Sequence, residues 1–282
     1  MKRSQKTKKL KRQGRALLAA LCVLSLVLVG ISGWKVYSII SSYKIAERRY
    51  DSLAGSAVAA SGPAASGSAA PVPAAPASGT DQEQPQPAAP EEERSPVTVD
   101  FDVLRSYGGD VVGWICLPDT VINYPVAQAR DNAFYLDRFL DGSPISGGTL
   151  FADCVCPSHF SGKNTIIYGH NMKDGSMFAL IDDYAEQSFY EEHPVMYLNT
   201  PAQNYRVDIF SGFVTDPESY VYTSAFSSTE DFAAHLRSLY AASEIDCGVS
   251  VTPDDRIVTL STCTYSGRDV RFVVCGKLTE IA

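Results

Sequence analysis

Three stretches of different hydrophobic pattern follow one another along the chain. Residues 16–34 contain no charged residue, and as a helix of 1.5 Å per residue they reach about 28 Å, close to the hydrocarbon thickness of a bilayer. Residues 51–100 contain no aromatic residue but hold eight of the sixteen prolines. From Phe101 onward, short apolar runs recur to the end of the chain. The pattern predicts a membrane helix, an unfolded linker and a folded domain.

The apolar helix is expected to be an uncleaved anchor. Residues 1–15 hold eight basic residues and no acidic one, and a basic flank stays on the cytoplasmic side. A cleaved signal peptide is the alternative, but its apolar region spans about 7–15 residues and ends at a small-x-small site. The nearest such triplets, around 57–59, lie too far downstream. We therefore expect a cytoplasmic N-terminus and a cell-membrane protein whose C-terminal portion is extracellular.

These observations divide the chain into four segments. We expect a basic cytoplasmic segment at 1–15, an anchor at 16–34, a juxtamembrane segment with a stalk at 35–97, and a folded domain at 98–282. The stalk is rich in alanine, proline and serine, so it cannot bury enough apolar surface to offset the entropy of ordering it. It is expected to be disordered and to hold the folded domain away from the membrane.

The last stretch of the chain is dominated by strand signals. Runs rich in β-branched and aromatic residues alternate with polar turns. These runs lie at 113–117, 121–127, 147–153, 164–171, 195–199, 205–214, 256–263 and 270–278. Helix signals are sparser: a capping box from Ser227 to Glu230 precedes an apolar period of three to four, and 132–140 and 177–190 are weaker candidates. We predict a mainly β fold, a closed or half-closed barrel with peripheral helices.

Composition and charge narrow the classes of protein. The chain has 282 residues and a net charge of −8. Beyond residue 15 it holds 16 basic and 32 acidic residues. That excess argues against nucleic-acid binding, because phosphates need a basic surface. Seven cysteines are an odd number and a small share of the chain, which does not fit a disulfide scaffold.

One cysteine is placed as a nucleophile would be. Cys263 ends an apolar strand and precedes the turn-prone segment 264–269, so it is expected at the rim of the barrel. Arg271 begins the next strand, and antiparallel pairing of the two strands would bring it beside Cys263. A guanidinium there could stabilise a thiolate and donate to an oxyanion. Arg268 is the alternative donor, although its place within the turn favours solvation.

The other cysteines and histidines are weaker candidates, with one exception. Cys154 and Cys156 form an isolated C-x-C pair with no histidine array, so neither a metal site nor a disulfide is favoured there. His170 ends an apolar strand and opens a polar, glycine-containing loop. A histidine and a cysteine at two strand ends form a plausible pair across a barrel rim, although 93 residues separate His170 from Cys263.

Several separated motifs carry a resemblance to a known family. The segment YGHNMKDGSMF at 168–178, the segment TLSTC at 259–263 and the RFVV that begins at Arg271 look like the signature segments of the sortases. The GHNM form and the DNAFYL segment at 131–136 resemble class B sortases in particular. The likeness runs from about residue 98 to residue 278, which is nearly all of the predicted domain.

The resemblance implies a fold and an activity. It implies an eight-stranded β-barrel and a membrane-anchored cysteine transpeptidase of Gram-positive bacteria. Such an enzyme cleaves a sorting motif near the C-terminus of a secreted protein and passes the acyl group to an amine of the peptidoglycan cross-bridge or of a pilin. The resemblance implies no metal and no organic cofactor.

The same resemblance assigns roles to residues. It implies that Cys263 is the nucleophile that forms a thioacyl intermediate. His170 would be general acid for the leaving amine and general base for the incoming one, and Arg271 would stabilise the oxyanion. Three further positions are expected near the substrate: Ser261, Asn132 and Thr264, the last through its backbone N–H.

Other functions remain open at this stage. An L,D-transpeptidase usually has its histidine within a few residues of the cysteine, and a papain-like hydrolase has the cysteine before the histidine, so both fit poorly. A non-catalytic surface module would be marked by loss of Cys263, His170 or Arg271, and all three are present. Pilin polymerisation competes with cell-wall anchoring. We favour anchoring, since neither an inhibitory lid nor a C-terminal membrane helix is evident in the sequence.

Overall fold

The computed structural model describes residues 2–61, 93–263 and 270–282, without the side chains of 2–20, 22, 23 and 263. The chain divides into two compact units, Met1–Arg48 and Arg49–Ala282, which are described one by one.

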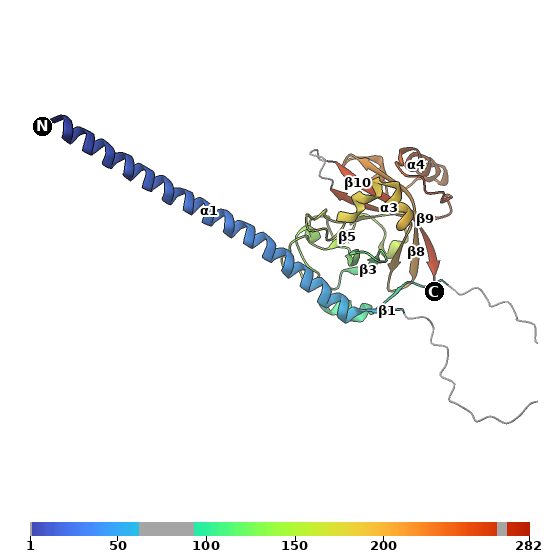
Figure 1. The fold of residues 1–282 in the computed structure, drawn as a ribbon. Coiled ribbons are helices and arrows are strands. Elements are labelled where there is room, and N and C mark those ends of the chain that lie inside the picture. Colours follow the sequence, from blue (N-terminus) through green and yellow to red (C-terminus); the bar gives the residue numbers. More distant parts are fainter. Residues whose placement is uncertain (1, 62–92, 264–269) are drawn as a thin grey trace, which may run out of the picture. The chain divides into compact units, whose positions relative to one another are not determined.

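The first unit lies within a single long helix, α1 (Lys2–Ala57), drawn in blue in Figure 1. Among the described residues, Leu24–Ala57 is the one helical stretch whose length and composition would allow it to cross a membrane. Its apolar side chains are solvent-exposed, as shown by Leu26 and Trp34, each 71% exposed. Such a surface suits lipid, since a helix satisfies its own backbone hydrogen bonds. The predicted N-terminal apolar helix is therefore confirmed as a candidate membrane span.

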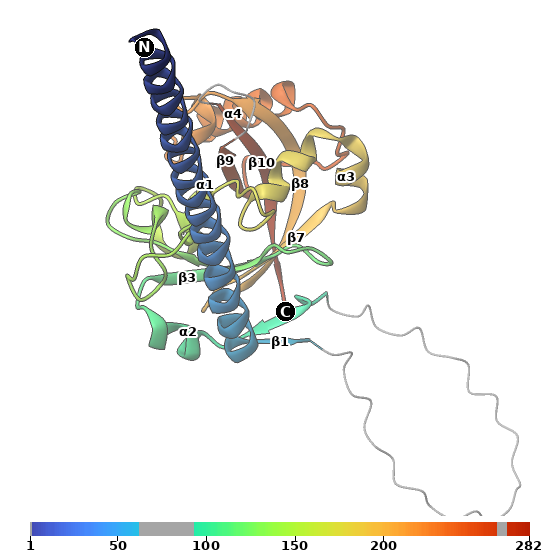
Figure 2. The same ribbon diagram turned by 60° about the vertical axis from the view of Figure 1, so that its left-hand side comes forward.

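The second unit is built around a closed barrel of eight strands (Figure 2). The strands are β3 (Val111–Cys116), β4 (Asn123–Ala127), β5 (Leu150–Ala152), β6 (Asn164–Tyr168), β7 (Val195–Asn199), β8 (Asn204–Thr215), β9 (Arg256–Cys263) and β10 (Arg271–Ile281). Their order around the barrel is β10-β8-β7-β3-β4-β5-β6-β9. The pairs β4–β5 and β6–β9 are parallel, and the other neighbours are antiparallel. The predicted eight-stranded barrel is confirmed.

Short helices surround the barrel. They are α2 (Phe101–Tyr107), α3 (Gln187–Glu192), α4 (Thr229–Ala242) and the 3₁₀ turns η1 (Phe134–Leu136), η2 (Ser158–Phe160), η3 (Ala179–Ala185) and η4 (Tyr220–Tyr222). The predicted capping box is wrong by one residue. Ser228, not Ser227, caps α4, because its side chain accepts a hydrogen bond from Asp231 N at 3.1 Å. The weaker helix candidates form only 3₁₀ turns and the short α3.

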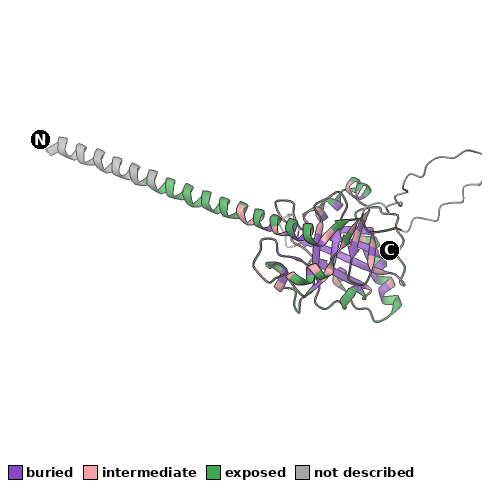
Figure 3. Ribbon diagram, turned by 90° about the horizontal axis from the view of Figure 1, so that it is seen from below, coloured by how far each residue is buried: buried purple, intermediate pink, exposed green. Residues whose placement is uncertain are grey.

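The strands are buried along most of their length, as Figure 3 shows in purple. One part of the core lies under α4, and we call it the α4 cluster. It consists of Phe210, Phe213, Val221, Phe232, Leu236, Leu239, Ile257, Val273 and Cys275. The apolar period of α4 puts three of these side chains on one helix face, which packs against β8, β9 and β10.

A two-stranded sheet joins a segment that the sequence analysis placed in the stalk to one that spans the predicted boundary between stalk and domain. β1 (Val58–Ala60) pairs antiparallel with β2 (Val97–Val99), and Ser61 N donates to Pro96 O at 2.9 Å. Most of the predicted disordered stalk, 62–92, lies outside the described residues. Because the residues on either side of it are paired, it is an insertion into the second unit rather than a connection between the two units. The domain boundary at residue 98 stays a prediction.

Candidate active site

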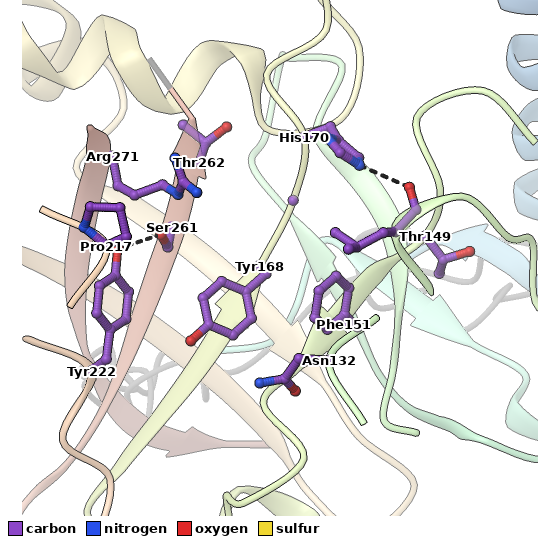
Figure 4. A pocket seen from close by; sticks show the side chains of 12 residues that line it. Asn132, Thr149, Phe151, Tyr168, His170, Pro217, Tyr222, Ser261, Thr262 and Arg271 are labelled. Carbon is purple, nitrogen blue, oxygen red and sulfur yellow. Dashed lines mark hydrogen bonds between the residues drawn. The ribbon is translucent and has the colours of Figure 1, made fainter. Parts of the chain in front are cut away.

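A cavity of about 220 Å³ opens where β6 and β9 end and β10 begins. Its walls mix aromatic rings with hydroxyl, imidazole and guanidinium groups (Figure 4). The lining residues are Asn132, Leu136, Thr149, Phe151, Tyr168, Gly169, His170, Pro217, Tyr222, Ser261, Thr262 and Arg271.

Strand register brings three distant positions to this rim. β6 and β9 run parallel, with Tyr168 beside Ser261, and Gly169 N extends the ladder by donating to Ser261 O at 3.1 Å. His170 lies two residues after Tyr168, just beyond the end of β6, and Cys263 lies two residues after Ser261, at the end of β9. β9 and β10 are antiparallel, with Cys263 paired to Arg271. The expected neighbourhood of Cys263 and Arg271 is thus observed for the backbone; the Cys263 side chain lies outside the described residues.

Both the side chain and the backbone of His170 are hydrogen-bonded. Its Nε2 lies 2.8 Å from Leu136 O, and its own carbonyl accepts a hydrogen bond from Phe178 N at 3.0 Å. A carbonyl oxygen only accepts, so Nε2 must carry the hydrogen in this contact. A neutral ring then presents its lone pair on Nδ1, which makes Nδ1 the atom able to take up a proton.

Arg271 brings a permanent positive charge to the cavity wall. Its side chain is partly buried and lines the cavity near Ser261 and Thr262. The next residue on β10, Phe272, pairs with Thr262 and is buried in the barrel. This burial holds the start of β10, and with it Arg271, in place. A guanidinium carries several donors in one plane, which suits a developing oxyanion.

Two tyrosines form a second wall whose hydroxyls are already engaged. Tyr222 OH lies 2.9 Å from Ser261 Oγ, and Tyr168 OH donates to Asp153 Oδ2 at 2.8 Å. The two rings lie 6.0 Å apart, and Tyr168 also contacts Phe151 at 5.4 Å. Burial raises the pKa of Tyr168, so its hydroxyl stays protonated and donating. This wall therefore presents aromatic rings whose hydroxyls are already hydrogen-bonded.

The remaining predicted positions differ in their surroundings. Asn132 lines the cavity, but its Oδ1 accepts from Cys154 N at 2.8 Å, so it also fixes the loop after β5. Ser261 is buried, and its hydroxyl is engaged by Tyr222. Thr264 and the alternative donor Arg268 lie outside the described residues.

The sequence analysis missed several lining residues. Tyr168 directly precedes the GHNM motif and could have been found from it. Leu136 ends the DNAFYL segment quoted above, but nothing in the sequence assigned it a role. Thr149 lies in the predicted run 147–153 and Tyr222 in η4, where no local signal indicates a site. Their proximity depends on closure of the barrel.

The other described thiols are poorly suited to nucleophilic attack. Burial raises the pKa of Cys116 and Cys247 to about 11 and that of Cys275 to about 12, which leaves very little thiolate at neutral pH. Cys154 and Cys156 are free thiols, and burial raises the pKa of Cys156 as well. Within the described part of the chain, no three His, Cys, Asp or Glu side chains are grouped as metal ligands would be.

Comparison with known proteins gives consistent results. The model of the Sortase domain family matches residues 115–279. Sortase B of Listeria monocytogenes is 39% identical over 178 residues, which are 62% of this chain and 72% of that protein. The structure of a Staphylococcus aureus sortase B-substrate complex has a TM-score of 0.62 at 34% identity, covering 64% of this chain and 85% of that one. A sortase B complexed with triglycine gives 0.61 at 34% identity, covering 64% and 86%.

Proposed function

The chain belongs to the sortase family, as a class B member and a cysteine transpeptidase, and from this premise we propose that it attaches secreted proteins to a cell-wall amine through a thioacyl intermediate on Cys263. The resemblance found in the sequence motifs is confirmed at the level of family and class. The observation that supports the proposed chemistry is the strand register. Cys263 pairs with Arg271, and the residue two positions before His170 pairs with the residue two positions before Cys263.

In the first half of the proposed reaction, a peptide bond is exchanged for a thioester. His170 Nδ1 takes the proton of the Cys263 thiol, and the resulting thiolate attacks the carbonyl carbon of the sorting motif. Arg271 donates hydrogen bonds to the oxyanion that forms. His170 gives a proton to the leaving nitrogen as the C–N bond breaks. The hydrogen bond from Nε2 to Leu136 O leaves Nδ1 as the atom that exchanges this proton. The products are a thioacyl enzyme and a released C-terminal peptide.

In the second half, an amine replaces the thiolate. His170 takes a proton from the attacking amine, the new amide bond forms, and the Cys263 thiolate leaves. A thioester persists long enough for an amine to arrive, which favours transfer over hydrolysis. Two observations support a cell-wall acceptor: the relatives are class B sortases, and one of them is described in complex with triglycine. Pilin polymerisation is not favoured by these relatives.

We propose that α1 anchors the enzyme in the cell membrane with its N-terminus in the cytoplasm. The supporting observations are the apolar stretch in Leu24–Ala57 and the eight basic residues in 1–15. A basic flank is retained in the cytoplasm, which would expose the catalytic unit outside the cell. Its partners would then be secreted proteins with a sorting motif and the amines of the peptidoglycan.

The test uses the full chain in detergent with a library of sorting-type peptides, each with and without triglycine. We expect acceptor-dependent ligation and a Cys263 thioacyl adduct, both read by mass spectrometry. Cys263→Ala should abolish both and leave the unfolding temperature within a few degrees of the parent. Cys154→Ala, which alters a free thiol on another loop, is the matched control and should keep full activity. Turnover that survives in Cys263→Ala would contradict the assignment.

A further inference from the structure

The last turns of α1 are part of the catalytic unit. From Arg49 onward the helix is grouped with the barrel. Three of its side chains are nearly or fully buried there: Tyr50 is 5% exposed, Leu53 0% and Ala57 3%. Burial of this kind holds the helix end against the domain, because large apolar side chains are stabilised when they are removed from water.

Tyr50 reaches a turn beside the cavity. Its hydroxyl donates to Gly148 O and lies 3.0 Å from Thr149 Oγ1. Its ring meets the edges of Tyr124 and Phe139 at centroid distances of 5.4 and 5.2 Å. Thr149 itself lines the cavity. Tyr50 thus ties the helix end to a wall of the site.

The turn that Tyr50 holds is packed directly on the backbone that contacts His170. Gly148 has φ +56°, and a Cβ placed there would lie 2.5 Å from Leu136 O, so the backbones touch without room for a side chain. Thr149 N donates to Tyr135 O at 2.9 Å, and Thr149 Oγ1 donates to Arg138 O at 2.8 Å. These contacts lie on either side of the Leu136 carbonyl, which is the carbonyl that accepts from His170 Nε2.

Arg49, next to Tyr50 on the helix, contacts the preceding part of the same loop. Its guanidinium donates to Ser143 Oγ and Asp141 Oδ2, both at 2.7 Å, and lies 4.0 Å from the ring centroid of Phe139. Arg49 therefore contacts residues 139–143 of the segment 138–149, and Tyr50 contacts Phe139 and the C-terminal residues 148–149. The segment has no regular strand or helix of its own until β5 begins at Leu150, so these contacts matter for its shape.

We propose that Tyr50 is a positioning residue for catalysis: through Gly148 and Thr149 it fixes the Leu136 carbonyl, which orients the His170 imidazole. The inference rests on the proposed function insofar as His170 is the acid and base of that reaction. It assigns to the end of the membrane helix a part in the chemistry, in addition to anchoring.

The test compares Tyr50→Phe with Tyr43→Phe in the full chain in detergent. Tyr50→Phe keeps the buried ring and removes the hydroxyl, while Tyr43→Phe makes the same change seven residues earlier, outside the catalytic unit. For Tyr50→Phe we expect kcat for ligation to fall about tenfold, the scale of one lost hydrogen bond, with KM changed less than twofold. Tyr43→Phe should match the parent in both constants.

A second readout does not depend on turnover. In the chain labelled with ¹⁵N-histidine, the Nε2 signal of His170 reports its hydrogen bond, and a His170→Gln variant assigns it. The signal should move in Tyr50→Phe and stay in place in Tyr43→Phe. An unchanged signal together with unchanged kcat would overturn the proposal, as would a lowered unfolding temperature as the sole effect. If the parent fails to ligate any peptide, the proposed function fails, while the Nε2 signal still decides the role of Tyr50.

Discussion

The same two strands, β9 and β10, build two regions of opposite character. In the α4 cluster they contribute Ile257, Val273 and Cys275, all fully buried among apolar neighbours. A few residues further along β9, and earlier on β10, the strands reach the cavity with Ser261 and Arg271. One region holds the barrel together, and the other presents polar groups on a rigid support. Stability and catalysis should therefore respond to different substitutions on neighbouring parts of one sheet.

The largest effect on stability is expected in the α4 cluster. Phe232 is 1% exposed, and its ring lies 4.8 Å from that of Phe226. Phe232→Ala leaves a cavity and should lower the free energy of unfolding by about 3–5 kcal/mol, measured by denaturant titration. Ligation by the folded fraction at low temperature should be close to that of the parent. Val214→Ala, at a β8 position that is 47% exposed, is the control and should change stability by about 0.5 kcal/mol or less.

At the cavity, by contrast, a substitution should reduce activity strongly and stability little. Arg271→Ala should reduce kcat/KM about 10²–10³-fold, which is the scale of losing an oxyanion donor, and should change unfolding far less than Phe232→Ala. Arg256→Ala provides the control at the opposite end of β9, where Arg256 pairs with Glu280 at 2.7 Å. An equal loss of activity in the two variants would show that Arg271 acts through the fold instead of the oxyanion.

The sequence predicted some features of these two regions and not others. Runs such as 256–263 predicted strands because β-branched residues favour them, and Cys263, His170 and Arg271 stood out because reactive residue types occurred at strand ends. The parallel pairing of β6 with β9 has no local signal, since it joins segments about 90 residues apart. The Leu136 carbonyl could not be predicted either, because a backbone group contributes chemistry without leaving a mark in the residue type.

The helix end shows a different reason for a missed feature. Tyr50 and Leu53 lie in the stretch that the sequence analysis assigned to the juxtamembrane segment and stalk, yet both are buried. The ring of Tyr50 packs against Tyr124 and Phe139, which are far away in the sequence. The pairing of β1 with β2 joins residues on either side of a proline-rich stretch, which composition alone predicts to be a plain linker. Tertiary contacts of this kind override local composition.

The smallest and most discriminating effect concerns pH, because a buried histidine lies beside the α4 cluster and a partly buried aspartate lies next to the cavity. His235, on α4, is 7% exposed, and its Nε2 has no hydrogen-bond partner among the described residues. Burial lowers its pKa to about 4, below the ordinary value of 6.5. Between pH 4 and pH 6.5 the unfolded chain therefore binds a proton that the folded chain does not. The free energy of unfolding should fall by about 2 kcal/mol from pH 7 to pH 5. Denaturant titrations of His235→Gln should show this loss reduced.

Next to the cavity the sign is opposite. Asp182 Oδ2 accepts a hydrogen bond at 2.6 Å from Nδ2 of Asn171, the residue that follows His170. The other carboxylate oxygen, Asp182 Oδ1, is buried and has no hydrogen-bond partner among the described residues. Burial raises its pKa from 3.8 to about 6, so the folded chain keeps a proton that the unfolded chain has released. The contribution of Asp182 to stability should then be greatest below pH 4 and fall as pH rises through 6, by about 1 kcal/mol because the side chain is partly exposed. Asp182→Asn should flatten this slope in the same titrations and leave the His235 slope intact. If both variants removed the same part of the pH dependence of stability, the two groups would not titrate independently. The α4 cluster and the cavity could then not be treated as separate regions.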